Sequence, residues 1–430
     1  MPKQNAHKKY PNDMNLLTRP SFIQAIGQIS ASNDSHHTLI YTEINQVPKI
    51  ASLLQGIPAE EKLIRAIQGV IYDRVKNLPE ARMGKLGWNR FAIILKLPIK
   101  ESLAVAEDLA QLLDNQSVDI EGVSYYPKLI FGVTPLSPEY KTPERILAAV
   151  DEALFQARRT GNSVVKLIEH DDPILLAYYD SLRLLPLITE GLKTQSFVLF
   201  AQPIIAITPQ ATDEQKFEVL LRFKNEEGDI DLESRFLQTA ELFHISREID
   251  YYVVHQFCRY YSQGNHDNTL YSLNISGSTI RYSPFIDVLE KEFKQFGVNS
   301  EQICFEITET VADRDYKQAI DFMKILKNQL GCLLSLDDIG IGSSNLANLS
   351  KFDVDFFKID GSFIKDVLVD RYSELVVNFI TSAAKLYGRK TIAEYVENAQ
   401  QLDKLRSLGV DFAQGYFTGK PEILFDPMWD

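Results

Sequence analysis

Two adjacent aspartates, Asp337 and Asp338, stand at the end of a short, mostly apolar segment, residues 333–336. A segment of this length and composition is typical of a strand buried on both faces, so both acids would leave the core together. Neighbouring ionised carboxylates repel each other, and one of them takes up a proton unless a cation lies nearby. The pair therefore predicts a divalent metal ion at this strand end.

Other short apolar segments in the C-terminal half of the chain also end in polar side chains. These side chains are Glu218, Asn274, Glu306, Glu309, Lys358, Glu394 and Gln414. Most intervals between them suit single strand–helix repeats, and parallel barrel strands would bring all of them to one mouth, where barrel enzymes have their active sites. Solvent exposure or a neighbouring charge would explain any one of these residues, but not polar groups at seven successive strand ends.

Shorter helical and strand segments alternate in the N-terminal half. Strands over residues 38–42, 91–95 and 126–133, with helices over 60–75, 103–113 and 143–160, predict an α/β domain over residues 16–169. Residues 1–15 are interpreted as a disordered tail, and residues 195–430 as a second, barrel domain. Residues 170–194 have apolar positions at helical spacing and predict a connecting helix. This helix either carries signals between the domains or forms a dimer contact, or it simply packs on the second domain.

The composition limits the possible classes of protein. Lys and Arg total 45 against 58 Asp and Glu, which gives a net charge of −13 over 430 residues. This balance argues against DNA binding and favours a cytoplasmic protein. Cys258, Cys304 and Cys332 lie in or beside apolar segments and are expected to be buried and reduced. No apolar run reaches the roughly 18 to 20 residues of a membrane helix, and no signal peptide is expected.

Several segments around the polar strand ends have a recognisable order. They are Glu218-Val219-Leu220, Asp337-Asp338-Ile339-Gly340-Ile341-Gly342, Lys358-Ile359-Asp360, Ala393-Glu394-Tyr395-Val396-Glu397 and Gln414-Gly415-Tyr416-Phe417. Together they resemble the EAL domain, the cyclic di-GMP phosphodiesterase family, over about residues 195–425. Val219 replaces the alanine of the name-giving motif, Ile339 and Ile341 replace a phenylalanine and a threonine, and Tyr395 replaces the usual glycine.

The resemblance implies a TIM-like (β/α) barrel that hydrolyses cyclic di-GMP to linear pGpG. An all-oxygen, carboxylate-rich cluster suits two Mg²⁺ or Mn²⁺ ions. By resemblance, the metal ligands are Glu218, Asn274, Glu306, Asp337 and Asp338, with Asp337 bridging the two ions. The catalytic residues are Glu218, Lys358, which positions the attacking water, and Glu394, which supports it. The substrate contacts are Gln202, Leu220, Arg222, Gln414 and Pro421, and Glu309 anchors the loop after Asp338.

The order of elements in residues 16–169 resembles a GGDEF (diguanylate cyclase) domain, with residues 151–162 as its last helix and turn. This implies a smaller α/β domain with a mostly antiparallel sheet. The signature hairpin would fall on residues 87–91, where Trp88 fills a glycine position and Asn89 and Arg90 replace both acids. The metal-binding aspartate would fall near Glu43. The domain is therefore expected to be degenerate, without cyclase activity, and to be regulatory or dimerising.

A second function stays open because Ile339 and Ile341 alter the loop after the two aspartates. The alternative is a receptor that binds cyclic di-GMP without cutting it and signals to an unidentified protein partner. Such receptors often lose metal ligands, whereas this chain has the whole set, so hydrolysis is the preferred interpretation. A homodimer is expected for the hydrolase.

Overall fold

Segments rich in β-branched and aromatic residues alternate with amphipathic helices along the chain, and the computed structural model places them in space. It describes residues 14–32, 36–45, 57–115, 117–120, 123–159, 165–209, 214–224, 230–231, 235–314, 316–340, 349 and 351–427. The chain divides into two units, residues 1–180 and 181–430, and the boundary falls within helix α6 (Pro173–Thr194).

The first unit is built on a five-stranded sheet in the order β2-β3-β1-β6-β7. The central strand β1 pairs antiparallel with β3 and β6, whereas β7 lies parallel to β6. The mostly antiparallel sheet expected from the sequence is confirmed. The elements are α1 (Arg19–Ser30), β1 (Thr38–Ile44), α3 (Ile57–Val75), β2 (Arg82–Lys85), β3 (Arg90–Leu95), α4 (Ile99–Asn115), β4 (Val118–Ile120), β5 (Val123–Tyr125), β6 (Leu129–Pro135), η1 (Pro138–Tyr140), α5 (Pro143–Arg159) and β7 (Val165–Leu167).

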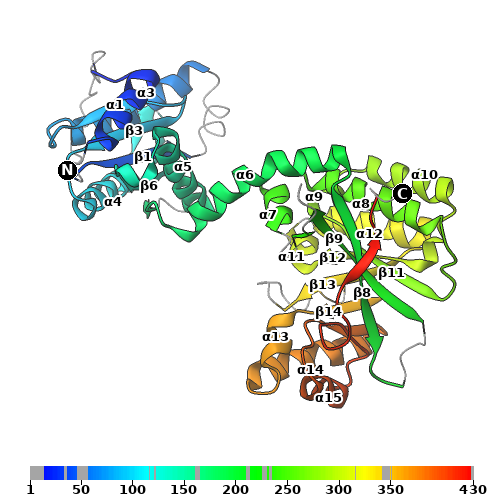
Figure 1. The fold of residues 1–430 in the computed structure, drawn as a ribbon. Coiled ribbons are helices and arrows are strands. Elements are labelled where there is room, and N and C mark those ends of the chain that lie inside the picture. The colour runs from blue at the N-terminus through cyan, green and yellow to red at the C-terminus, as the bar shows by residue number, and fades with distance from the viewer. Residues whose placement is uncertain are drawn as a thin grey trace. The chain divides into compact units, whose positions relative to one another are not determined.

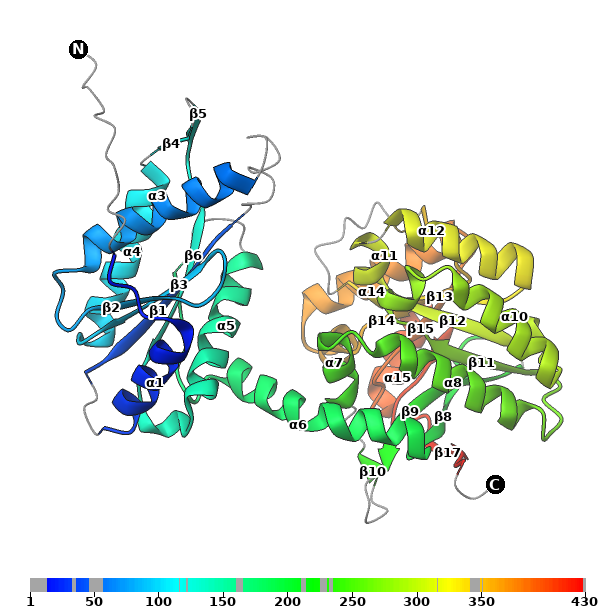
Figure 2. The same cartoon turned by 90° about the horizontal axis from the view of Figure 1, so that it is seen from above.

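Helices cover both faces of this sheet (Figure 2). Ile40 and Ile44 of β1 belong to a core shared with α3 and α4, whereas Leu39 and Tyr41 belong to a second core shared with α1 and α5. Successive strand residues point to opposite faces, so β1, which is buried along its whole length, contributes to both cores.

The second unit begins in α6 and contains a barrel surrounded by helices (Figure 1). Its elements are β8 (Phe197–Ala206), β9 (Gln215–Lys224), β10 (Ile230–Asp231), α7 (Arg235–Leu242), α8 (Ser246–Tyr261), β11 (Thr269–Asn274), α9 (Gly277–Ile280), α10 (Pro284–Phe296), η2 (Ser300–Gln302), β12 (Ile303–Thr308), α11 (Glu309–Arg314), α12 (Tyr316–Ile325), η3 (Leu326–Leu330), β13 (Leu333–Ile339), β14 (Phe356–Ile359), α13 (Gly361–Asp366), α14 (Arg371–Leu386), β15 (Lys390–Ala393), α15 (Ala399–Leu408), β16 (Phe412–Ala413) and β17 (Glu422–Phe425).

The barrel closes because β8 pairs with both β9 and β16. From β9 through β11, β12, β13, β14 and β15 to β16, each strand lies parallel to the next, whereas β8 is antiparallel to both of its neighbours. The expected TIM-like barrel is confirmed, and the reversed direction of β8 is a feature that the sequence did not predict.

The inner wall of the barrel has an apolar layer and a polar layer. The apolar layer, near the starts of the parallel strands, consists of Ile204, Leu270, Cys304, Phe356, Ile392 and Phe412. Two residues further along the chain from four of them come Glu306 and Lys358, which lie on β12 and β14, and Glu394 and Gln414, which directly follow β15 and β16. Because strand side chains alternate with a period of two, both sets face the same interior. The polar groups therefore meet at the carboxyl ends of the parallel strands.

The cysteines and the helices bear on two further expectations. The three cysteines are free and buried, as predicted. Among the residues that the structure describes, none of the helices combines the length and the apolar character needed to cross a membrane.

Candidate active site

The ammonium group of Lys358 lies at the centre of the polar layer. Its Nζ atom is 2.6 Å from Oε2 of Glu306, 2.8 Å from Oε1 of Glu394, 3.2 Å from Oδ2 of Asp337 and 3.5 Å from Oε2 of Glu218. Burial opposes the charge on the lysine, but these carboxylates, Asp337 foremost, hold its pKa well above the ordinary value. The barrel thus gathers side chains that lie far apart in the sequence around one buried cation.

Two amides hold the carboxylate of Glu218 from the other side. Nδ2 of Asn274 donates to its Oε1 (2.8 Å), and Nε2 of Gln414 donates to its Oε2 (2.7 Å). The same Gln414 nitrogen lies 3.2 Å from Oε1 of Gln202, which β8 places opposite Glu218. Burial alone would raise the pKa of Glu218, but Lys358 and these amides outweigh it and hold the pKa below its ordinary value.

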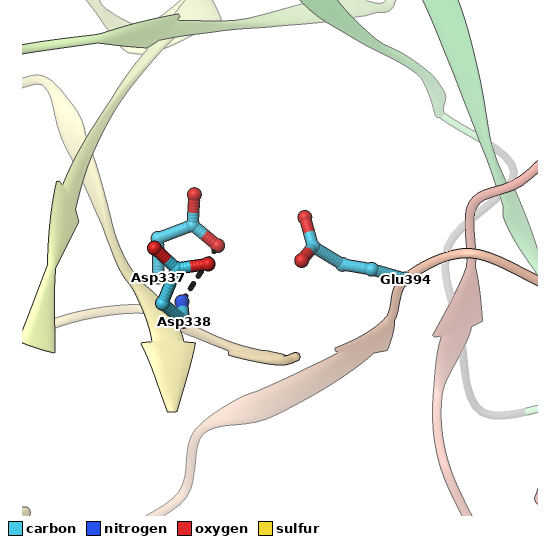
Figure 3. A group of neighbouring side chains, drawn as sticks. All are labelled: Asp337, Asp338 and Glu394. Atoms are coloured by element: carbon cyan, nitrogen blue, oxygen red, sulfur yellow. Dashed lines mark hydrogen bonds between the residues drawn. The ribbon is translucent and has the colours of Figure 1, made fainter. Parts of the chain in front are cut away.

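Asp337 and Asp338 share one side of the mouth although consecutive strand residues normally point to opposite faces. The pairing of β13 with β14 shifts register between Leu336 and Ile339, and Asp338 has a left-handed backbone (φ +55°). Such a bulge re-aims a side chain. As a result, oxygen atoms of Asp337, Asp338 and Glu394 lie within 4.8 Å of one another, and Figure 3 shows Glu394 facing the pair across the mouth.

One ammonium cannot neutralise so many carboxylates. Burial, with the charges of Glu218 and Asp337 adding to it, raises the pKa of Glu306 to about 8. Burial and the neighbouring Asp337 raise the pKa of Asp338 to about 6. Burial and Asp337 also raise the pKa of Glu394 well above its ordinary value. The cluster therefore holds protons that a bound cation would displace.

The donor set fits hard divalent cations. All of these acidic side chains offer oxygen, the ligand atom that Mg²⁺ and Mn²⁺ prefer. Oε1 of Glu306 is buried and has no hydrogen-bond partner among the described residues. A buried carboxylate oxygen without a donor calls for an explanation, and a metal ligand position provides one.

The remaining predicted site residues lie on β9, just before β17 and at the start of α11. Leu220 lies half-buried on β9, and Nη1 of Arg222 donates to the carbonyl of Leu221 (2.8 Å). Pro421 is half-buried just before β17. Oε2 of Glu309 accepts a hydrogen bond from the backbone N–H of Gly340 (3.1 Å), which is a contact that the predicted anchor role requires.

The loop after the two aspartates is only partly described. Ile339, the first substituted position, is buried in the barrel core. Ile341, the second substituted position, lies outside the described residues.

Asp250 on α8 supports the site in a way that the sequence did not indicate. It is buried, and its Oδ2 accepts hydrogen bonds from the backbone N–H of Ser276 (3.0 Å), the Ser276 hydroxyl (2.6 Å) and the Thr279 hydroxyl (2.6 Å). Ser276 lies two residues beyond Asn274, so Asp250 fixes the segment that carries this amide. A lone aspartate within an amphipathic helix has no sequence signal for such a role.

We expect Asp250→Asn to change how stability depends on pH. Burial raises the pKa of Asp250 to about 6, against about 4 in an unfolded chain. Between about pH 4 and 6 the folded protein keeps a proton that the unfolded chain has released, so the wild-type free energy of unfolding falls as pH rises through this window. Asparagine does not titrate. The free energy of unfolding of the variant should therefore rise by about 2 to 3 kcal/mol relative to that of wild type between pH 4 and pH 6.

Urea unfolding of both proteins at several pH values measures this difference. Asp321→Asn, at an exposed position on α12, is the control and should follow the wild-type curve. Parallel pH curves for wild type and Asp250→Asn would contradict the buried, titrating carboxyl.

Comparison with known protein families agrees with this arrangement. Residues 187–421, more than half of the chain, match the family model of the EAL domain. The chain belongs to the EAL domain family. Residues 16–163 match the family model described as diguanylate cyclase, GGDEF domain. A GGDEF domain and an EAL domain therefore occur in tandem, as the sequence motifs predicted.

Several curated relatives of this EAL protein are named as phosphodiesterases. It is 26% identical over 414 residues to the cyclic di-GMP phosphodiesterase PdeB of Shewanella oneidensis, and the match covers 95% of this chain and 47% of PdeB. It is 29% identical over 251 residues to the cyclic di-GMP phosphodiesterase PdeF of Escherichia coli, covering 58% of this chain and 33% of PdeF. The chain thus spans half or less of the length of these relatives.

Solved structures show the same folds. The PaMucR phosphodiesterase in its c-di-GMP complex superposes with a TM-score of 0.52 at 25% identity, covering 56% of this chain and 98% of that one. The Vibrio cholerae LapD S helix-GGDEF-EAL structure, bound to c-di-GMP, superposes with a TM-score of 0.55 at 20% identity and covers 94% of both chains. The second comparison extends the shared fold to both domains.

Proposed function

We propose that the EAL domain hydrolyses one phosphodiester bond of cyclic di-GMP and releases linear pGpG. The observation that carries this proposal is the set of four carboxylates around the ammonium of Lys358. The names of PdeB and PdeF and the c-di-GMP in the PaMucR structure support the choice of substrate.

Charge balance supports a pair of divalent cations. The five carboxylates of Glu218, Glu306, Asp337, Asp338 and Glu394 against one ammonium leave four negative charges when all are ionised. Two divalent cations would balance this charge and let the mouth hold an anionic dinucleotide, which a negative pocket would repel. We infer that Mg²⁺ or Mn²⁺ fills this role.

Within this proposal, each side chain has a definite task. When bound, the two cations would activate a water and stabilise the displaced oxygen. The ligands of one cation would be Glu218, Asn274, Glu306 and Asp337, and those of the other Asp337 and Asp338. Lys358 would donate a hydrogen bond to the attacking water, and Glu394 would hold the ammonium in place from the opposite side.

The substrate-binding groups would surround the reacting phosphodiester. Arg222 presents a planar guanidinium suited to the second phosphate. The nucleotide would be lined by Gln202, Leu220, Gln414 and Pro421. Glu309 would fix the loop after Asp338 through Gly340.

The test is incubation of purified protein with cyclic di-GMP and Mn²⁺, followed by chromatography for pGpG. Product that appears with Mn²⁺ and not with EDTA supports the proposal. Bound cyclic di-GMP with no product after long incubation would instead favour a receptor that signals to a protein partner.

We propose that the GGDEF domain has no cyclase activity and is regulatory or dimerising. Glu43, near which the metal-binding aspartate would fall, is buried and has an oxygen 2.6 Å from Nε of Arg90 and 2.5 Å from Nη2 of Arg158. Two guanidinium groups thus satisfy the carboxylate that a cyclase would use for its metal.

Trp88 stands in the signature hairpin and is exposed. Trp88 fluorescence and phosphodiesterase rate should both stay unchanged in a GTP titration.

We further propose that the protein forms a homodimer through an exposed apolar face of α14, defined by Tyr372, Leu375, Phe379 and Leu386. Their spacing of three, four and seven residues places them on one side of the helix. Exposed apolar patches of this kind often mark protein interfaces. All four side chains are uncharged, so two copies can bring them together across a two-fold axis without setting like charges of these residues against each other.

We expect Phe379→Glu to weaken this dimer about a hundredfold, because two buried glutamates would face each other across the axis. Analytical ultracentrifugation over a concentration series measures the dissociation constant. Lys324→Glu, at an exposed position on α12, is the charge-change control. A Phe379→Glu variant that dimerises like wild type would remove this face from consideration.

A further inference from the structure

Tyr395 has an unusual backbone at the mouth of the candidate site. It directly follows Glu394, and its φ of +52° lies in the left-handed region that bulky side chains rarely adopt. Glycine would occupy this position without strain. A strained residue beside an active site suggests that its side chain contributes to function.

The tyrosine ring lies against the backbone of the neighbouring loop. A Cβ atom added to Gly361 would stand 2.2 Å from Cδ2 and 2.6 Å from Cγ of Tyr395, so only glycine at 361 allows the ring to lie there. Gly361 begins α13 after β14, whereas Tyr395 follows β15. The ring therefore spans two adjacent loops at the end of the barrel where Lys358 and Glu394 meet.

Most of Tyr395, which directly follows Glu394, is open to solvent. Tyr395 is 68% exposed although its ring contacts Gly361. Burial, with the charges of Glu394, Glu218, Asp360 and Asp338 adding to it, raises the pKa of its phenol above the ordinary value. An uncharged aromatic surface thus stands at the rim of a strongly acidic mouth.

We propose that Tyr395 is a substrate-binding residue whose ring stacks on a purine base of the bound cyclic dinucleotide. This inference rests on the proposed function, which places a phosphodiester over Asp338 and Glu394. An aromatic ring binds the face of any nucleobase without a charge of its own, which suits a mouth where carboxylates would repel a polyanion. Contact with Gly361 holds the ring in place before the ligand arrives, which lowers the entropy cost of binding.

Two substitutions distinguish the contribution of the aromatic face from those of the side-chain size and the hydroxyl group. Tyr395→Phe keeps the aromatic face and loses only the hydroxyl, whereas Tyr395→Leu keeps a bulky apolar side chain on Gly361 and loses the aromatic face. Tyr126→Leu, an exposed tyrosine of the other unit, is the matched control. Circular dichroism and thermal unfolding confirm that each variant is folded.

Cyclic di-GMP binding is measured with Ca²⁺ as the cation, with chromatography to check that no pGpG forms, and turnover is measured with Mn²⁺. We expect Tyr395→Leu to raise both the Kd and the KM about tenfold. Tyr395→Phe and Tyr126→Leu should stay within about twofold of wild type. A lost stacking contact appears in KM, whereas a displaced Glu394 would appear in kcat alone.

Three results would overturn this role of Tyr395. They are an unchanged Kd and KM in Tyr395→Leu, an equal loss in Tyr395→Phe, and a loss confined to kcat. Wild type that binds cyclic di-GMP but forms no pGpG with Mn²⁺ would refute hydrolysis alone, and the Kd values would still decide the role of Tyr395. Wild type that does not bind cyclic di-GMP would refute both proposals.

Discussion

Replacing Glu218 by alanine is expected to lower turnover of cyclic di-GMP by at least about a thousandfold. Loss of a group that is essential to metal-assisted chemistry has an effect of this size. The carboxylate accepts hydrogen bonds from Asn274 and Gln414 and lies 3.5 Å from the ammonium of Lys358. Alanine leaves both amides without this acceptor and removes a charge that a cation would need. Steady-state pGpG release, together with Mn²⁺ titration by calorimetry, measures both losses.

The control for this variant is Glu290→Ala, which removes a carboxylate from an exposed position on α10 and should behave like wild type. A Glu218→Ala protein with near-normal turnover would refute the assignment of the metal centre. If the variant lost turnover but bound Mn²⁺ with unchanged affinity, Glu218 would be a substrate contact and not a metal ligand.

The fold was largely predictable because its interior follows a simple period. Apolar residues such as Phe356 and Ile392 lie near the starts of their strands. Lys358 comes two residues after Phe356, and Glu394 two residues after Ile392, so each faces the same side as the apolar residue before it. A parallel barrel turns this repeated pattern into an apolar floor and a polar mouth. The direction of β8 could not be predicted, because an apolar run such as residues 197–207 has no signal for parallel or antiparallel pairing.

The candidate site was predictable in its residue types but not in its geometry. The adjacent aspartates indicated a cation, yet only the register shift and the left-handed Asp338 explain how both carboxylates reach the same side. Lys358 was expected to position a water, and the structure adds that its ammonium contacts four carboxylates from separate strands. Such contacts depend on strand register over long sequence separations, which a single sequence does not encode locally.

Replacing Lys358 by methionine is expected to lower the free energy of unfolding in EDTA by about 3 to 5 kcal/mol, because it leaves a buried carboxylate cluster without its cation. The side chain is fully buried, and its Nζ contacts Glu306, Glu394, Asp337 and Glu218. Methionine preserves the length of the side chain and removes the charge. The loss of one positive charge should also strengthen the attraction for divalent cations, so Mn²⁺ should stabilise the variant more than wild type. Urea unfolding with EDTA and with Mn²⁺ gives both values.

Lys216 offers a matched control, because it is a buried lysine inside the same barrel at the opposite end. It pairs with Glu214 and lies 5.3 Å from the ring centroids of both Phe356 and Phe412. Lys216→Met removes the same charge away from the carboxylate cluster, so its loss of stability should be the same with and without Mn²⁺. If Lys358→Met were as stable as wild type in EDTA, the cluster would be protonated enough to need no cation. If Mn²⁺ stabilised both methionine variants equally, the cation would bind elsewhere than around Lys358.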